Sequence, residues 1–117
     1  MDAAAAGADV VALYFSASWC GPCRGFTPVL ARAHEALRAA GGRIEVVLVS
    51  LDSREERFED CFAGMPWLAV PFGEAALRDD LGELFGVQGI PALVLLRAAD
   101  GGVLVEDGVS AVRYGDE

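Results

Sequence analysis

Hydrophobic residues follow one another almost without interruption in three short stretches, and this pattern predicts buried strands. The stretches are Val10–Phe15, Val46–Leu51 and Ala92–Leu96. Strands covered on both faces of a sheet show continuous rather than alternating apolar character. No apolar stretch reaches the roughly 18 residues that a membrane span needs, so the pattern predicts a globular core and no membrane partner.

Helical periodicity fills the segments between these strands. The first predicted helix covers Pro22–Ala40, is kinked at Pro28 and ends at Gly41-Gly42. Its predicted apolar face carries Cys23, Phe26, Leu30, Ala33 and Leu37. The length and the single apolar face indicate a helix that packs along one side of a sheet.

Two further helices are predicted before the third strand. Ser53 and Glu56 have the spacing of a capping box, which starts a helix that runs to about Gly64. Its apolar face is predicted to carry Phe58, Cys61, Phe62 and Met65. The next helix is predicted over Glu74–Phe85 and ends at Gly86. Together with the first helix, these helices must cover the two faces of the sheet.

The C-terminal part predicts a hairpin and a last helix. Asp100-Gly101-Gly102 is a tight-turn signal that leads into a strand at Val103–Val105, antiparallel to the third strand. Ser110 is the predicted N-cap of the final helix. The order β-α-β-α-α-β-β-α predicts an α/β fold with a central mixed sheet and helices on both faces. We expect a flexible lead-in at residues 1–8 and one domain at residues 9–117.

The charge balance narrows the classes of partner. The net charge is −9, from 18 acidic and nine basic residues, and all nine basic residues are arginine. An acidic chain without basic clusters is unsuited to nucleic acid or anionic membranes. A secretory signal begins with a positively charged region, and the opening residues here carry no Lys or Arg. We therefore expect a cytoplasmic location, with the nucleus as a second option.

The chemistry that stands out is the cysteine pair in the segment SASWCGPC. Cys20 is predicted at a helix N-terminus, where unpaired N–H groups and the helix dipole favour a thiolate. Pro22 suits the first turn because it has no N–H to pair, and Arg24 adds a positive charge one turn along. Cys23 lies one turn later, within reach of a mixed disulfide at Cys20. The spacing predicts a redox-active pair.

Half of a zinc site is the alternative use of such a pair. Structural zinc needs four ligands, and the chain adds only Cys61 and His34 to the pair. His34 lies eleven residues past Cys23 on the same predicted helix, roughly 16 Å along its axis. We therefore expect no metal and no cofactor. His34 is predicted to be an inert residue on a solvent-leaning helix, and Cys61 a buried small hydrophobe.

The two tryptophans have different predicted roles. Trp19 directly precedes Cys20, so we expect it to form part of the substrate-contact surface. Trp67 is predicted to fill space between the second and third helices. Gly89-Ile90-Pro91 precedes the third strand, where an X-Pro bond is either an ordinary turn or a functional element.

Three segments together resemble the tryparedoxin and nucleoredoxin branch of the thioredoxin superfamily. They are YFSASWCGPCRGFTP, MPWLAVPF and FGVQGIPALVLL, within a similarity that covers most of Val10–Asp107. Family members are protein disulfide reductases: tryparedoxins hand electrons to peroxidases, and nucleoredoxins regulate or protect partner proteins. The resemblance implies a thioredoxin-like fold over residues 9–117.

The resemblance also implies residue roles. Cys20 would be the nucleophile, Cys23 the resolving thiol, and Pro91 a cis-proline packed beside them. The backbone of Ile90 would pair with an extended substrate strand. Trp19, Gly21 and Pro22 would complete the substrate-binding surface.

The chain departs from the branch at two places in the site. The branch has Pro-Pro between the cysteines, whereas here Gly21-Pro22 stands there, as in thioredoxins, which suggests a reducing couple near about −270 mV. Thioredoxins bury an aspartate six residues before the nucleophile, whereas here Tyr14 stands there, as in tryparedoxins. We name Asp52, just after the second strand, as the candidate proton acceptor for Cys23.

Both ends are shorter than the family pattern. The customary N-terminal strand or hairpin is missing and the last helix has about two turns, so the edge of a core strand could be exposed. The chain could be one domain of a multidomain nucleoredoxin, or it could cover that edge by dimerising.

Two hypotheses follow for the function. The first is a reductase of protein disulfides, peroxidases among them, regenerated by an upstream thiol or reductase such as glutathione or a thioredoxin reductase. The second is a redox-regulated interaction module of the nucleoredoxin type, which binds a partner through Trp19 and Ile90-Pro91 with little turnover.

Overall fold

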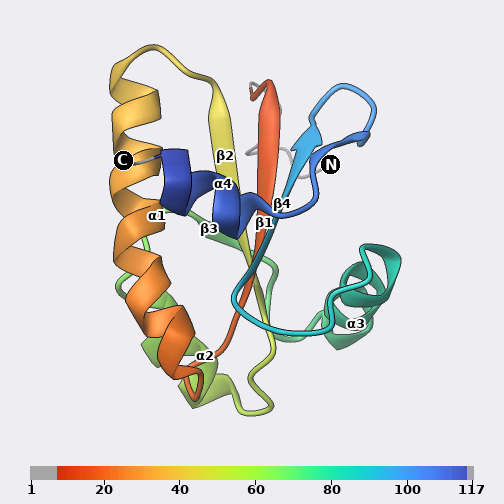
Figure 1. Cartoon of the computed structure of the whole chain (residues 1–117). Coiled ribbons are helices and arrows are strands. Elements are labelled where there is room, and N and C mark those ends of the chain that lie inside the picture. Colours follow the sequence, from red (N-terminus) through yellow and green to blue (C-terminus); the bar gives the residue numbers. More distant parts are fainter. Residues whose placement is uncertain (1–7, 116–117) are drawn as a thin grey trace.

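A five-stranded mixed sheet forms the centre of the computed structural model, which describes residues 8–115 (Figure 1). The strand order is β3-β2-β1-β4-β5. The strands are β1 (Val10–Ser16), β2 (Ile44–Ser50), β3 (Leu68–Ala69), β4 (Ala92–Arg97) and β5 (Val103–Val105). The helices are α1 (Gly21–Ala39), α2 (Glu55–Phe62), α3 (Ala75–Leu84) and α4 (Gly108–Gly115). The predicted strands and helices are all present, and the predicted mixed sheet is confirmed.

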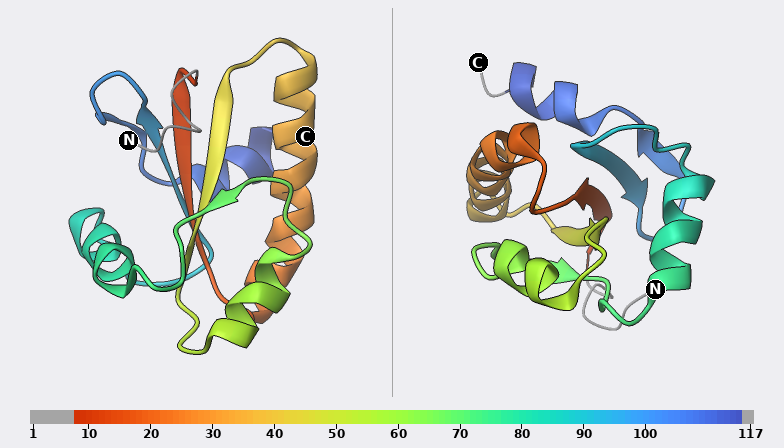
Figure 2. Two further views of the ribbon diagram at one scale, coloured as in Figure 1. Left: turned by 180° about the vertical axis from the view of Figure 1, so that it is seen from behind. Right: turned by 90° about the horizontal axis from the view of Figure 1, so that it is seen from below.

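Helices cover both faces of the sheet. Phe26 of α1, Phe58 of α2 and the apolar side of α4 pack against one face, around Tyr14 and Leu48. The other face buries Leu13, Phe15 and Val49 among others. Leu81 of α3 and Phe85, which directly follows α3, pack on these residues. The right panel of Figure 2 shows α3 on the side of the sheet opposite to α1. Two buried faces explain why the strands read as continuous apolar runs.

The sheet topology brings three loops to one edge. β1 and β2 are parallel and end together, with Ser16 opposite Ser50. β4 is antiparallel to β1 and begins at the same edge, with Ala92 opposite Phe15. The segments after β1, after β2 and before β4 therefore meet there.

The buried face of α1 differs from the predicted one. The buried positions are Cys23, Phe26, Leu30 and His34, whereas Leu37 is 48% exposed. Spacings of 3, 4 and 4 follow the 3.6-residue turn, but a strict repeat of seven drifts by about 20° per heptad. Extending the face to Leu37 was therefore wrong. Pro28 lies inside the helix, whose ribbon changes direction along its length (Figure 1).

Two predicted helix caps were wrong. The N-cap of α2 is Arg54 and not Ser53, with no capping hydrogen bond from its side chain; Arg54 forms an ion pair with Glu56. At α4, the Asp107 carboxylate accepts from the Ser110 N–H at 3.1 Å and from its hydroxyl, so Asp107 caps the helix. These bonds hold the pKa of Asp107 below its ordinary value. Ser110 lies inside the first turn because helix α4 begins two residues earlier, at Gly108.

Gly108 allows α4 to approach β4 closely. A Cβ atom there would lie 2.7 Å from the Leu93 carbonyl oxygen and 2.7 Å from a methyl of Leu95. Only glycine fits without a shift of the helix. This contact places the C-terminal helix across the same face as α1.

Trp67 and His34 pack against each other, contrary to both predictions. Trp67 is 6% exposed, with its ring edge-on to Tyr14 and to His34, so it fills space beneath α1 rather than between α2 and α3. His34 is also 6% exposed, not solvent-leaning. Burial, with a contribution from Arg38, lowers the pKa of His34 and favours its neutral form, although Glu45 opposes this.

The edge predicted as exposed carries a short strand that the sequence pattern did not predict. β3 pairs with β2 at Val47 and Leu48. The other residues of β2 have no pairing partner in β3, which is only two residues long. The predicted lead-in at residues 1–8 lies almost wholly outside the described residues, and the boundary at residue 9 stays a prediction.

Candidate active site

Cys20 and Cys23 form a disulfide at the N-terminus of α1. Cys20 is the N-cap residue, and its Sγ accepts from the Cys23 N–H at 3.2 Å. The first turn contains no acidic residue. Cys20 is 6% exposed and Cys23 only 1%. The sulfur nearer to solvent thus belongs to Cys20, and it lies where the free N–H groups of a helix stabilise a thiolate.

The loop before β4 lies directly beside this pair. The Ile90-Pro91 peptide bond is cis, as the resemblance implied. The Cys20 Sγ lies 3.7 Å from the Ile90 carbonyl oxygen. The sheet topology accounts for this contact, because β1 ends and β4 begins at the same edge.

An open groove of about 500 Å³ contains the outer sulfur. Four of the predicted substrate-contact residues, Trp19, Gly21, Pro22 and Ile90, line it with Cys20. The sequence analysis did not identify its other lining residues, which are Leu51, Val87, Gln88 and Gly89. Trp19 is 65% exposed and forms one wall, so the groove offers apolar surface next to the disulfide.

Asp52 is buried at the same edge and holds the loop before the cysteines. Its carboxylate accepts from the Ser18 N–H at 3.1 Å and from the Ser18 hydroxyl at 2.7 Å. The Ser50 hydroxyl lies 3.2 Å from the same carboxylate. Among the described residues, none of its hydrogen bonds reaches a sulfur. The structure therefore shows Asp52 fixing Ser18, two residues before Cys20.

Arg78 of α3 ties the neighbouring loops together. Its guanidinium donates to the carbonyl oxygens of Ser50 at 2.9 Å, Asp52 at 3.2 Å and Phe72 at 2.9 Å, and stacks over the Phe72 ring. The sequence analysis missed this residue because its acceptors are backbone carbonyls, which leave no signature in the sequence.

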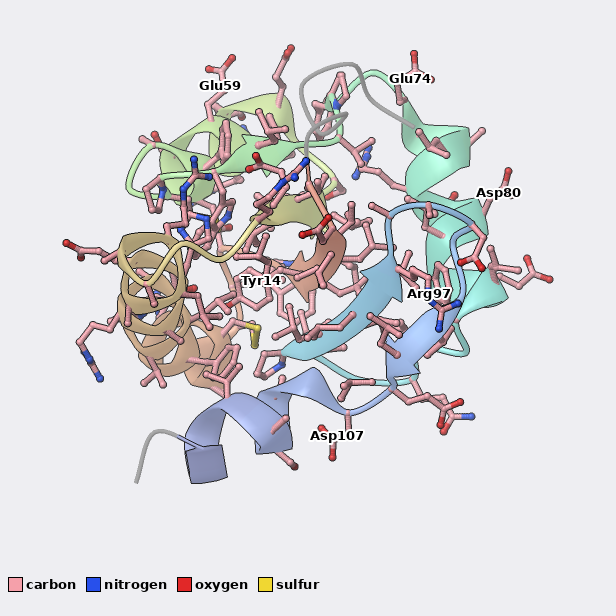
Figure 3. All side chains as sticks on the ribbon, turned by 90° about the horizontal axis from the view of Figure 1, so that it is seen from above. Tyr14, Glu59, Glu74, Asp80, Arg97 and Asp107 are labelled. Carbon is pink, nitrogen blue, oxygen red and sulfur yellow. A yellow bond between two sulfur atoms is a disulfide. The ribbon has the colours of Figure 1, made fainter. Side chains whose placement is uncertain are left out.

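Tyr14 supports the inner cysteine from below. Its hydroxyl lies 3.2 Å from the Cys23 carbonyl oxygen and 2.7 Å from the Thr27 hydroxyl, which itself donates to that carbonyl at 3.0 Å. Figure 3 shows Tyr14 in the interior between the sheet and α1, while Glu59, Glu74, Asp80 and Asp107 point outward around the rim. At the position where thioredoxins have a buried aspartate, this chain thus has a tyrosine whose hydroxyl bonds to the backbone of Cys23.

The third cysteine lies apart from the pair. Cys61 is half-buried rather than buried, and it lines a separate hollow with Met65 and Pro28. Burial and the charge of Asp52 raise the pKa of its thiol, which therefore stays protonated at neutral pH. Within residues 8–115, no group of three His, Cys, Asp or Glu side chains could hold a metal ion. Nor does this part of the chain contain a helix long and apolar enough to cross a membrane.

A sequence model of a family described as thioredoxin-like matches residues 7–103. The chain belongs to this thioredoxin-like family. Its similarity to tryparedoxins and nucleoredoxins places it in the branch that these proteins form. It is 50% identical to a tryparedoxin of Trypanosoma brucei brucei over 94 residues. The match covers 80% of this chain and 65% of the relative. It is 52% identical over 107 residues to a probable nucleoredoxin 1 of Arabidopsis thaliana, covering 90% of this chain but 18% of the relative.

The solved structures agree with this thioredoxin-like assignment. The structure of native tryparedoxin I from Crithidia fasciculata superimposes with a TM-score of 0.91 at 38% identity, over 97% of this chain and 78% of that one. The thioredoxin-like fold predicted from the sequence is confirmed. The chain is a thioredoxin-like protein in which two of its three cysteines, Cys20 and Cys23, are joined in a disulfide. It spans about two thirds of the tryparedoxin and under a fifth of the plant nucleoredoxin.

Proposed function

We propose that this chain reduces disulfide bonds of other proteins through Cys20 and Cys23. The observation that carries the proposal is the disulfide at the N-terminus of α1, with its outer sulfur in an open groove beside the Ile90 carbonyl. A nucleophile needs a stabilised thiolate with access to its substrate, and this position provides both.

The reaction has two exchange steps. The Cys20 thiolate attacks one sulfur of the substrate disulfide, a mixed disulfide forms, and the other substrate sulfur leaves as a thiolate. The Cys23 thiolate then attacks Cys20 Sγ, and the second substrate sulfur leaves. Two electrons have passed to the substrate, and the chain holds the Cys20–Cys23 disulfide. A thiol donor, such as a small dithiol or a reductase, restores the dithiol.

The groove residues would hold the substrate during both steps. The Ile90 carbonyl would accept a backbone N–H of an extended substrate segment, as in strand addition to a sheet edge. The cis bond to Pro91 belongs to the turn that presents this carbonyl next to the sulfur. Trp19, Gly21 and Pro22 form the rest of the contact surface, which is apolar and open.

Cys23 must lose a proton before the second step, and Asp52 remains the proposed acceptor. Asp52 lies at the same sheet edge and is 2% exposed. Its carboxylate accepts from the hydroxyls of Ser18 and Ser50, and Ser18 lies two residues before Cys20.

A second candidate is a redox-regulated interaction module. The exposure of Trp19, 65%, and of Leu51, 43%, on one groove gives an apolar surface that a partner could cover without turnover. Capture of a partner that survives Cys20→Ser would favour this module, because binding would not then require the exchange reaction.

Catalysed reduction of a protein disulfide by dithiothreitol tests the first proposal. We expect the intact chain to accelerate the reduction, and Cys20→Ser to return the rate to that of dithiothreitol alone. Cys61→Ser is the matched control, since it makes the same change outside the groove, and it should keep the rate within about twofold. Unchanged turnover in Cys20→Ser would show that Cys20 is not the nucleophile.

A further inference from the structure

Most described arginines already have partners, but two beside the active site do not. Ion pairs join Arg38 to Glu45, Arg43 to Asp9, Arg54 to Glu56 and Arg97 to Asp100. Arg78 donates to backbone carbonyls. Within residues 8–112, Arg24, Arg32 and Arg57 form no ion pair with another described residue. Two of these three, Arg24 and Arg57, lie together, although the chain as a whole has a net charge of −9.

Arg24 of α1 and Arg57 of α2 line the same hollow of about 400 Å³, next to Arg54. Both are exposed. Trp19 forms a wall of this hollow and also of the groove that contains Cys20. The two depressions are therefore neighbours across one indole ring. Arg24 is one helical turn from Cys20, with its N–H bonded to the Cys20 carbonyl at 3.2 Å.

The acidic residues near the hollow leave this positive charge available. Asp52 also lines it, but Asp52 is 2% exposed and its carboxylate accepts from Ser18 and Ser50. Asp60 lines the adjoining hollow with Arg24 and Arg57, yet pairs with neither. Glu56 forms its ion pair with Arg54, and the nearby charge of Arg57 also helps to lower the pKa of this carboxyl. Arg24 and Arg57 form no ion pair with a described residue, are exposed, and carry planar donors suited to a carboxylate.

We propose that Arg24 and Arg57 form a carboxylate-binding subsite for an acidic side chain close to the disulfide of the protein substrate. This inference rests on the proposed reductase function and names a class of substrate for it. A segment held at the Ile90 carbonyl crosses the groove beside Trp19, and a Glu or Asp one or two residues from its cysteine reaches over the indole. The subsite selects acidic substrates although the chain itself is acidic.

The effect should be moderate and sensitive to salt, because both arginines are exposed. Two exposed charge contacts give about fivefold to tenfold in the second-order rate at low ionic strength. Screening should reduce this preference to about twofold or less near 0.5 M salt.

The test uses two disulfide-bonded peptides that differ only by Glu or Gln two residues from one cysteine. The pre-reduced full chain is mixed with each peptide, and the single-turnover rate is followed by mass spectrometry of quenched samples. We expect the Glu peptide to react about fivefold to tenfold faster than the Gln peptide. The double variant Arg24→Gln/Arg57→Gln should bring this rate ratio to about one.

Arg32→Gln is the matched control. Arg32 is an exposed, unpaired arginine on α1, eight residues beyond Arg24 and away from the groove. It should leave the Glu-to-Gln ratio unchanged. Using the ratio removes any effect of Arg24 on the Cys20 thiolate, because that effect acts on both peptides equally.

Each other outcome contradicts a specific claim. Reduction of both peptides at equal rates by the intact chain would overturn the subsite and leave the reductase proposal standing. Failure to reduce either peptide would overturn the reductase proposal itself. If the double variant slowed glutathione disulfide but kept the peptide ratio, the carboxylate would come from a small thiol, and the inference about protein substrates would be wrong.

Discussion

Cys23→Ser is expected to convert the chain from a turnover catalyst into a covalent trap. Without the resolving thiol, the mixed disulfide between Cys20 and the substrate cannot be released by an internal attack. Incubation of the reduced variant with a disulfide-bonded protein should give a stable one-to-one adduct, visible as the summed mass in non-reducing mass spectrometry. Turnover should fall by at least about a hundredfold.

The double variant Cys20→Ser/Cys23→Ser is the control for this trap. It retains Cys61, whose thiol has a raised pKa, and should form no adduct above background. An adduct that formed through Cys61, or that persisted when Cys20 was replaced, would contradict the assignment of Cys20 as the nucleophile.

Leu30→Ala is expected to destabilise the fold by about 2–5 kcal/mol. Leu30 is 4% exposed and packs between α1 and the sheet face that contains Tyr14 and Leu48. The substitution removes buried apolar area and leaves a cavity, because the surrounding side chains relax only in part. The free energy of unfolding, from urea denaturation followed by circular dichroism, measures the loss.

Leu37→Ala is the matched control, with the same substitution two turns further along the same helix. Leu37 is 48% exposed, so we expect a loss of about 1 kcal/mol or less. Equal losses in the two variants would contradict the buried face as the structure has it. They would instead support the apolar face predicted from the sequence, which included Leu37.

The sequence predicted the sheet well because its signals are dense and local. β1, β2 and β4 are continuous apolar runs, and the Asp100-Gly101-Gly102 turn connects β4 to β5. β3 was missed because two residues, Leu68 and Ala69, are too few to show any period. Its pairing is set by the position of β2, which a local pattern does not contain.

Errors at the helix ends have a different cause. Ser53 matched a capping box, but Arg54 takes the N-cap and pairs with Glu56, the residue that the box would have used. Cap signals depend on a short polar side chain, and several candidates compete within one turn. His34 and Trp67 were misjudged because their burial depends on tertiary contacts, including the contact between their two rings.

The sequence pointed to the candidate site where its residues lie in one segment. Trp19, Cys20 and Cys23 fall within five consecutive residues, and Ile90-Pro91 followed from the resemblance. The support beneath them was not predicted: Ser18, Asp52 and Arg78 form a network that joins the loop after β1, the loop after β2 and α3. Only the fold brings these elements to one sheet edge.

The equilibrium potential of the Cys20–Cys23 couple tests most directly whether this chain is a reductant. The full chain is equilibrated in glutathione redox buffers, and the dithiol fraction is quantified by alkylation and mass spectrometry. The account predicts a potential near about −270 mV, as expected for Gly-Pro between the cysteines. A potential as high as about −120 mV would instead describe an oxidant of thiols, and it would contradict the proposed function.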